Sequence, residues 1–195
     1  NNVLYVSKSG RDTNVGTSIG QSKLTIKGAL AIATPGTTVF IKSGDYTEIN
    51  PIVIPENVAI LGDSLRTVTI RPKTRSADVF YVNNGSYVGQ VTFKDHVAPS
   101  AAVSFNPDGS AGAITTSPYV QNATSMTTTG TGMRVDGAYV TGLRSMVVDA
   151  FTQYNQGGIG IHMKNGGNTQ LVSVFTICCE TGFLCESGGF CSITN

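Results

Sequence analysis

Apolar and polar residues alternate along most of this chain, in short runs that end at a glycine, an asparagine or a proline. Alternation of this kind predicts β-strands with one buried face. Four segments also share one pattern: alternating apolar residues, a polar pair, a glycine, and a second extended run. They are residues 79–93, 132–146, 160–174 and 182–195. A repeat of twenty to thirty residues is typical of coils stacked along an axis, each burying its inner face against its neighbours.

The alignment of the four segments predicts which side chains stack inside the coils. Residues at equivalent positions of successive repeats should lie directly above one another. We therefore expect one interior column to contain Val79, Phe80 or Val82, Val135, Met163 and Cys185.

The first fifty residues differ from the repeats. Val3–Ser7 reads as a short strand, and Leu24–Ala33 has apolar residues at helical spacing, with Ser22 as the expected N-cap and Pro35-Gly36 as the stop. Thr37–Glu48 reads as a strand and a turn. A short amphipathic helix before a repeat array is a natural cap, so we assign residues 1–50 to an N-terminal cap and first coil.

Residues 51–195 are assigned to the rungs of the solenoid. Three short β-branched runs, Pro51–Pro55, Asn57–Gly62 and Arg66–Pro72, fit the flat sides of a coil. Residues 98–131 are irregular and predict an enlarged rung or an external loop. The last repeat has no cap after it, so we expect the chain to be part of a longer polypeptide, or its end to be covered by another subunit or domain.

Composition narrows the classes of function. Charged residues are only 13% and the net charge is +1, which gives no basis for binding nucleic acid or an anionic membrane. No apolar run approaches the ~20 residues of a membrane span. The sequence also contains none of the motifs for phosphate, dinucleotide or zinc-protease sites, so we predict no cofactor.

Four cysteines lie close together near the end of the chain. Cys178, Cys179, Cys185 and Cys191 lack the spacing of a zinc site, so we predict no metal. Small apolar side chains suit a coil interior. We expect free thiols on successive sides of a coil, with at least two of them buried.

Three pairs of acids are candidates for catalytic groups: Asp45 with Glu48, Asp136 with Asp149, and Glu180 with Glu186. Acid and base must converge on one bond. The first pair falls in a turn where an Asp usually caps backbone N–H groups, and Asp136 occupies the turn position of its repeat. Glu180 and Glu186 are expected on successive sides of one coil. We therefore expect that the two carboxylates of each pair do not face one bond, and we predict no catalytic residue.

Histidines and tyrosines add little. Asp95 and His96 are strand neighbours and should point apart, and His162 should point outward. Five tyrosines are candidates for stacking against sugar rings, namely Tyr81, Tyr87, Tyr119, Tyr139 and Tyr154. Because Tyr87 and Tyr139 recur at one repeat position, we expect them to form a stack between rungs instead.

Two segments resemble known families. The pattern of Val3–Glu48, ending in GTTVFIKSGDYTE, resembles the opening of right-handed parallel β-helix proteins of the pectate-lyase-like class. Gly157–Asn195 resembles β-helix segments in virion structural proteins of tailed phages that infect marine cyanobacteria. The first resemblance implies an all-β, right-handed parallel β-helix with a helix-bearing cap. The second implies a component of a tail, baseplate, fibre or spike.

These observations lead to one expected function and two alternatives. The expected function is a rigid structural β-solenoid located in a phage virion, forming trimers, bound to other virion proteins and in contact with host-surface polysaccharide. We expect neither nucleic-acid binding nor membrane insertion. One alternative is a polysaccharide lyase or glycoside hydrolase, such as a tailspike depolymerase. It requires three or more Asp, Glu, Arg or Lys stacked on one outward face. The other is a carbohydrate-binding adhesin module, which requires an exposed aromatic row.

Overall fold

The computed structural model describes residues 2–138 and 142–194, which form a parallel β-helix. Its helices are the 3₁₀ turn η1 (Ile19–Gln21) and α1 (Ile26–Leu30). Its strands are β1 (Val3–Val6), β2 (Thr38–Ile41), β3 (Gly44–Glu48), β4 (Ile52–Val53), β5 (Ala59–Gly62), β6 (Val68–Pro72), β7 (Phe80–Tyr81), β8 (Tyr87–Lys94), β9 (Ala101–Ser104), β10 (Tyr119–Met126), β11 (Thr131–Asp136), β12 (Ser145–Tyr154), β13 (Ile159–Lys164), β14 (Asn168–Ile177), β15 (Thr181–Glu186) and β16 (Phe190–Thr194).

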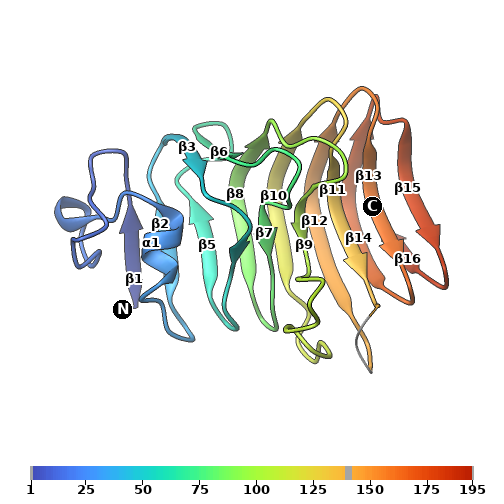
Figure 1. Cartoon of the computed structure of the whole chain (residues 1–195), viewed down its shortest axis with the longest axis horizontal. Helices are drawn as coiled ribbons and strands as arrows, with labels where there is room; N and C mark the ends of the chain where they lie inside the picture. Colours follow the sequence, from blue (N-terminus) through green and yellow to red (C-terminus); the bar gives the residue numbers. More distant parts are fainter. Residues whose placement is uncertain (1, 139–141, 195) are drawn as a thin grey trace.

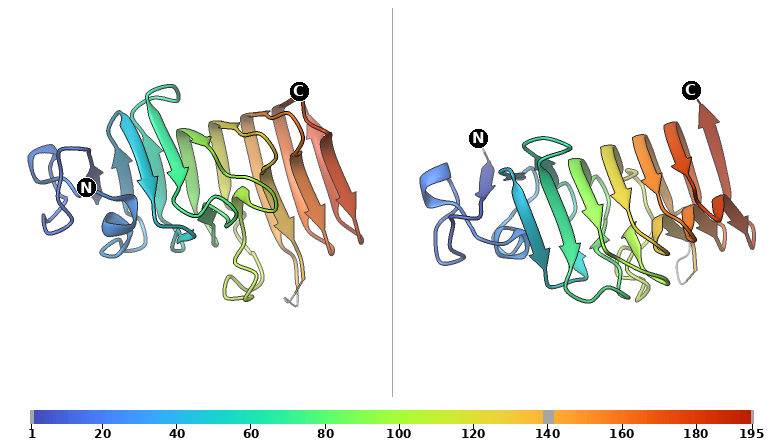
Figure 2. Two further views of the ribbon diagram at one scale, coloured as in Figure 1. Left: turned by 45° about the horizontal axis from the view of Figure 1, so that its top comes forward. Right: turned by 90° about the horizontal axis from the view of Figure 1, so that it is seen from above.

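The strands form two parallel sheets that follow the long axis of the molecule (Figures 1 and 2). Sheet A has the order β1-β2-β5-β8-β10-β12-β14-β16, with β3 and β6 paired alongside, and sheet B has the order β15-β13-β11-β9-β7-β4. From β7 onward each strand of sheet B is followed in the chain by one of sheet A, so one coil adds one strand to each sheet. The predicted all-β parallel β-helix with a short helix near its start is confirmed.

Each coil has three sides, because the long strands of sheet A bend in the middle. Gln90, Asn122, Ala150 and Ser173 have φ values of 58°, 49°, 50° and 49°, in the left-handed region. The strand register places them one above another in β8, β10, β12 and β14. The bend separates the partners of β8, because residues 87–89 pair with β5 whereas Thr92 and Phe93 pair with β6.

Aliphatic and aromatic side chains fill the interior in register. Val135, Met163 and Cys185 form one column, as predicted from the repeats. Phe80 belongs to the neighbouring column, however, where it pairs with Val103 of the next coil. The prediction was therefore wrong for Phe80, and also for Val79, which precedes it. The alternative that we gave for Phe80, Val82, does lie in the predicted column. Phe80 and Met133 both pair with Val103, so the positions two residues further on, Val82 and Val135, are equivalent. The sequence alignment had skipped the intervening coil.

The N-terminal helix is shorter than predicted and has a different cap. The side chain of Thr25, rather than that of Ser22, accepts a hydrogen bond from the backbone N–H of Gly28 at 2.9 Å. The helix ends at Leu30, before the Pro35-Gly36 stop. Ile26, Ala29 and Leu30 are buried, so the helix covers the first coils with its apolar face as expected.

Residues 98–131 form a complete coil that contains β9 and β10, so the structure shows an enlarged rung and not an external loop. Strand β9 pairs with both β7 and β11. The longest stretch without a strand in this coil is residues 105–118, between β9 and β10. No helix in the described part of the chain has the length and apolar character of a membrane span.

The cysteines correct a prediction. Cys185 of β15 and Cys191 of β16 lie on successive sides of the last coil, with their Sγ atoms 4.0 Å apart. None of the four cysteines is bonded to another, and none is fully buried: Cys178 and Cys185 are exposed, and Cys179 and Cys191 are half-buried. The prediction of at least two buried thiols was wrong, because no further coil among the described residues covers this interior.

Candidate functional site

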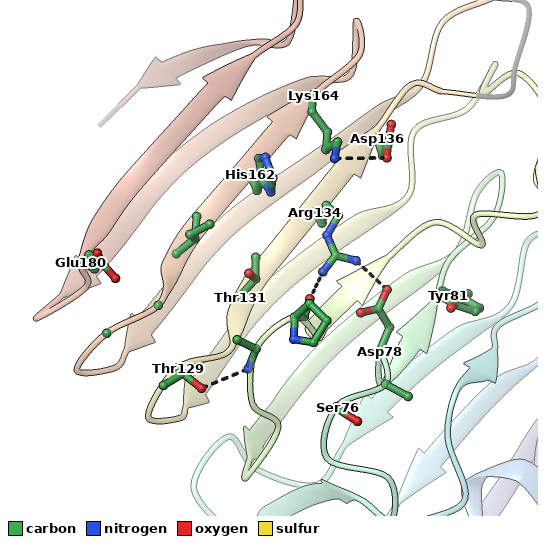
Figure 3. Close-up of a pocket in the computed structure, with 16 residues that line it drawn as sticks. Ser76, Asp78, Tyr81, Thr129, Thr131, Arg134, Asp136, His162, Lys164 and Glu180 are labelled. Carbon is green, nitrogen blue, oxygen red and sulfur yellow. Dashed lines mark hydrogen bonds and ion pairs between the residues drawn. The ribbon is translucent and has the colours of Figure 1, made fainter.

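A groove of about 630 Å³ crosses the outer face of sheet B (Figure 3). Strands β7, β11 and β13 and the turns before them provide most of its lining. We call it the sheet B groove, and its polar lining includes Ser76, Asp78, Tyr81, Thr129, Thr131, Arg134, Asp136, His162, Lys164 and Glu180.

Strand alternation places this polar lining. In β11 and β13 the inward residues Met133, Val135, Ile161 and Met163 are fully buried, so the residues between them point outward. Adjacent strands lie ~4.8 Å apart in the direction of their hydrogen bonds. The register sets Arg134 beside His162, and Asp136 beside Lys164. Each outward column therefore continues along the helix axis, which suits an extended ligand.

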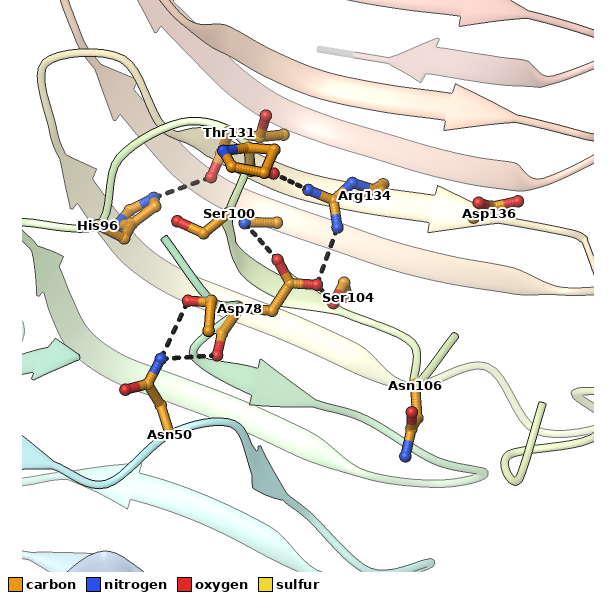
Figure 4. Close-up of polar contacts among 12 residues, drawn as sticks. Asn50, Asp78, His96, Ser100, Ser104, Asn106, Thr131, Arg134 and Asp136 are labelled. Atoms are coloured by element: carbon orange, nitrogen blue, oxygen red, sulfur yellow. Dashed lines mark hydrogen bonds and ion pairs between the residues drawn. The ribbon is translucent and has the colours of Figure 1, made fainter. Parts of the chain in front are cut away.

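Asp78 is the most strongly held acid of the groove (Figure 4). Its Oδ1 accepts the backbone N–H of Ala101 at 2.7 Å, and its Oδ2 accepts the hydroxyl of Ser104 at 2.6 Å and Nη1 of Arg134 at 2.8 Å. Nδ2 of Asn50 donates to the backbone oxygen of Asp78 at 3.1 Å. Because both oxygens of this carboxylate accept hydrogen bonds from neighbouring coils, Asp78 joins the coil of β7 to those of β9 and β11. Its role is therefore structural.

Arg134 connects this network to the open groove. Its second amino group donates to the backbone oxygen of Pro99, so the guanidinium is fixed by two partners on different coils. Its side chain is 21% exposed. It can therefore meet a ligand while keeping both partners.

Two further contacts between polar groups occur along the groove. Oδ2 of Asp136 lies 4.0 Å from Nζ of Lys164, and Nε2 of His162 lies 2.8 Å from Oε1 of Glu186. Oδ1 of Asp136 also accepts the backbone N–H of Ala138 at 2.9 Å, as expected for the turn position. Arg134 and Lys164 are both paired with acids, whereas Glu180 forms no ion pair with any described residue. The groove therefore has no surplus of positive charge.

The acid pairs considered from the sequence lie elsewhere or apart. Asp45 is in strand β3 and not in a turn, and accepts Nε of Arg71 at 2.9 Å. Glu48 is buried and accepts the backbone N–H of Ile26 at 2.8 Å, which caps α1. Burial raises the pKa of Glu48, against the opposing effect of these backbone donors. Neither residue faces the sheet B groove.

The other two pairs do not converge. Asp149 lies in β12 of sheet A, where its Oδ2 accepts the hydroxyl of Tyr119 at 3.1 Å, whereas Asp136 is in sheet B. Glu180 and Glu186 flank the single strand β15, so the expectation of successive sides was wrong. Asp136 and Glu180 both reach the groove, but from opposite ends of parallel strands (Figure 3).

The histidine predictions are confirmed. Asp95 is exposed, whereas His96 is fully buried and its Nε2 lies 2.9 Å from the backbone oxygen of Thr131. Burial lowers the pKa of His96. His162 points outward into the groove.

The tyrosines are dispersed over different faces. Tyr87 stacks on Tyr119 of the next coil, with ring centroids 6.3 Å apart and an interplanar angle of 17°. Tyr139, its expected partner, lies outside the described residues. Tyr81 lines the sheet B groove, and Tyr154 lies on the outer side of β12. The described tyrosines do not form the row that an adhesin would require.

Sequence reasoning missed Asp78, Arg134 and Lys164 as groove residues. Asp78 and Arg134 are 56 residues apart in the sequence. The coil that contains β9 lies between them, and the four aligned repeats do not include that coil. The sequence did contain a signal for these groove residues. Two repeats have charged or polar residues two positions apart at equivalent places, R-x-D at 134–136 and H-x-K at 162–164. The outward face thus contains the stack of charged residues that we required of the alternative function, a polysaccharide lyase or glycoside hydrolase.

Within residues 2–138 and 142–194 no group of three or more His, Cys, Asp or Glu is arranged to hold a metal ion. The lining offers hydrogen-bond donors from Arg134, Lys164, His162 and hydroxyl groups, and carboxylates as acceptors. That combination is typical of binding to hydroxyl-rich ligands such as sugars.

Comparison with known proteins agrees on the fold. No family model matches the sequence, and no curated protein matches it. Among solved structures, the chain is similar to pectin methylesterase PemA from Erwinia chrysanthemi, with a TM-score of 0.57 and 16% sequence identity. The match covers 88% of this chain and 54% of that structure, so the chain spans about half its length. The likeness establishes a shared parallel β-helix fold.

Proposed function

We propose that this chain is a rigid β-helix of a phage virion structural protein, and that it binds host-surface polysaccharide along the sheet B groove. The observation that carries the proposal is the groove itself, in which stacked strands present Arg134, His162, Asp136 and Lys164 in register. A linear sugar chain matches a surface whose polar groups repeat along one axis. The resemblance of Gly157–Asn195 to phage β-helices supports the virion setting.

The balance of charges selects the class of polysaccharide. Arg134 is paired with Asp78, and Lys164 with Asp136, so both positive charges are already balanced and the neighbouring acids would repel a strongly anionic polymer. A neutral, hydroxyl-rich chain can instead accept from the cations and donate to the carboxylates at once. We infer that the ligand of this groove is a neutral polysaccharide.

The test measures binding of neutral surface polysaccharides, purified from candidate bacterial hosts, to the wild-type chain. His162→Ala with Lys164→Ala should raise the Kd about tenfold, because both side chains line the groove and hold no buried partner. Lys27→Ala, an exposed change on α1, serves as control. Unchanged affinity in the double variant, or no binding by any neutral polysaccharide tested, would contradict the proposal.

A second candidate function is hydrolysis of the bound polysaccharide. Asp136 and Glu186 stand in one column on either side of Lys164. Two strand spacings separate their backbones by ~9.6 Å. Carboxyl groups of inverting glycosidases are about 6.5–9.5 Å apart. Release of oligosaccharides by the wild type, abolished by Asp136→Asn and by Glu186→Gln with binding retained, would establish hydrolysis in place of binding alone.

A further inference from the structure

A second groove runs along the third side of the coils and shares no lining residue with the sheet B groove. It consists of two adjacent hollows of about 570 and 310 Å³ that share Arg75 and Asp95 in their lining. The first hollow is bordered by β3, β6 and the turn after β6, and the second by the ends of β8, β10 and β12. We call the two hollows together the basic groove.

One outward column forms the floor of the basic groove. Thr47 pairs with Arg71, and the pairing of Ile70 with Phe93 places Arg71 beside the next residue, Lys94. Lys94 pairs with Met126, which pairs with Tyr154. The floor therefore changes along the axis from cationic to apolar, with one residue for each coil at ~4.8 Å spacing.

The cations of this groove are in excess over its acids. Arg71 is already bound to Asp45 and Asp95. Lys73, Arg75 and Lys94 form no ion pair with any described residue. Four cations and the two carboxylates bound to Arg71 leave a net charge of +2 at this groove, in a chain whose total net charge is only +1.

Arg75 is oriented toward such a ligand. Its Nε donates to the backbone oxygen of Asp95 at 2.8 Å, which fixes the plane of the guanidinium. Neither of its amino nitrogens donates a hydrogen bond to a side chain or backbone in the described part of the chain. A fixed guanidinium with two free amino groups is suited to bidentate contact with a carboxylate or sulfate.

The apolar end of the groove provides a surface for a sugar ring. Tyr154 is 40% exposed and Met126 39% exposed, next to each other in the column and within the same hollow as Arg75 and Lys94. An exposed aromatic ring can pack against the C–H face of a pyranose, while the cations bind its acidic substituents.

We propose that the basic groove is a second binding site, separate from the sheet B groove, and that it binds an anionic polysaccharide. Tyr154 contacts a sugar ring, and Arg75, Lys94 and Lys73 bind the carboxylate or sulfate groups of successive residues. A nucleic acid fits less well, because single strands are bound by several aromatic platforms in series and this groove has one.

The experiment compares three probes by titration: alginate as a polyuronate, poly-dT as a nucleic acid, and the neutral polysaccharide bound by the sheet B groove. The test variants are Arg75→Gln with Lys94→Gln, and Tyr154→Ala. The matched control, Arg11→Gln with Lys27→Gln, removes the same charge from exposed positions near the N-terminus. Circular dichroism confirms that each variant is folded.

We expect alginate to bind the wild type and the matched control alike, and the Arg75/Lys94 variant at least about tenfold more weakly, with affinity that falls as salt is raised. Tyr154→Ala should weaken alginate binding at every salt concentration. Binding of the neutral polysaccharide should not change in these variants, so this test is independent of the proposed function. Equal alginate affinity in both double variants, or tighter binding of poly-dT than of alginate, would overturn the proposal.

Discussion

Replacing Asp78 with alanine should unfold this β-helix more readily than any change of an exposed acid. The carboxylate joins three coils through Ala101, Ser104 and Arg134, and its side chain is only 9% exposed. The variant leaves the N–H of Ala101 and the hydroxyl of Ser104 without an acceptor in a buried place. Each such orphan costs about 1–3 kcal/mol.

Arg134 contributes less to the loss, because water reaches its partly exposed guanidinium and Pro99 still accepts from it. An ion pair in that setting contributes roughly 0.5–1 kcal/mol. The three effects together amount to roughly 2.5–7 kcal/mol. Within that range we expect the free energy of unfolding to fall by about 3–5 kcal/mol, the usual cost of breaking a buried pair. Asp78→Asn keeps the shape and one acceptor and should lose about 2–3 kcal/mol.

Urea denaturation followed by circular dichroism measures this difference. With a slope near 2 kcal/mol per molar urea, the midpoint should fall by about 1.5–2.5 M in Asp78→Ala. Asp45→Ala is the control, since that carboxylate is 56% exposed and such pairs contribute about 0–1 kcal/mol. A loss below about 1 kcal/mol for Asp78→Ala, or one no larger than that of Asp45→Ala, would refute the argument that this acid holds the coils together.

Three further predictions follow from buried or crowded positions. Because burial lowers the pKa of His96 below its usual 6.5, the unfolded chain binds a proton that the folded chain excludes. Stability should fall by up to about 1.4 kcal/mol per pH unit as pH drops below 6.5, and stay level above it; urea midpoints of His96→Gln should lack this part of the pH dependence. Gly132→Ala should cost about 1–3 kcal/mol in the same assay, because its Cβ would lie 2.5 Å from the backbone oxygen of Gly160. A thiol reagent should label exposed Cys185 in the native state faster than half-buried Cys191, whose pKa is raised by burial; peptide mass mapping reads both rates.

Each of these has a result that would contradict it. Equal pH profiles for wild type and His96→Gln would show that folding does not lower the pKa of His96. Gly20→Ala, whose Cβ meets nothing within 4 Å, is the control for the glycine, and an equal loss in both would exclude crowding as the cause. Faster labelling of Cys191 than of Cys185 would mean that the last coil is arranged differently.

The coils were predictable because they depend on local periodicity. The column Val135–Met163–Cys185 follows from counting residues between repeats, and the alternation in β11 and β13 decides which side chains face outward. The coil containing β9 could not be distinguished from an external loop, and the repeat alignment did not include it, because small residues such as Ala101 and Ala102 and the segment 105–118 hide its alternation. That omission moved Phe80 into the wrong column.

The candidate site was less predictable, since it depends on contacts between coils. Nothing near Asp78 in the sequence indicates that Arg134, 56 residues later, binds it. The basic groove likewise joins Arg75 and Lys94 to Tyr154 only through strand register. The prediction of buried cysteines was wrong for a related reason. A side chain that points into the coil is buried only where a further coil covers it.

The central claim is that the sheet B groove binds a neutral polysaccharide, and a crystal structure with a bound oligosaccharide tests it most directly. The oligosaccharide is prepared from whichever neutral polysaccharide binds the wild-type chain. The account predicts that the sugar lies along the outer face of β7, β11 and β13, in hydrogen-bond contact with Arg134, His162 and Lys164. A sugar bound on sheet A, with the sheet B groove empty, would contradict it.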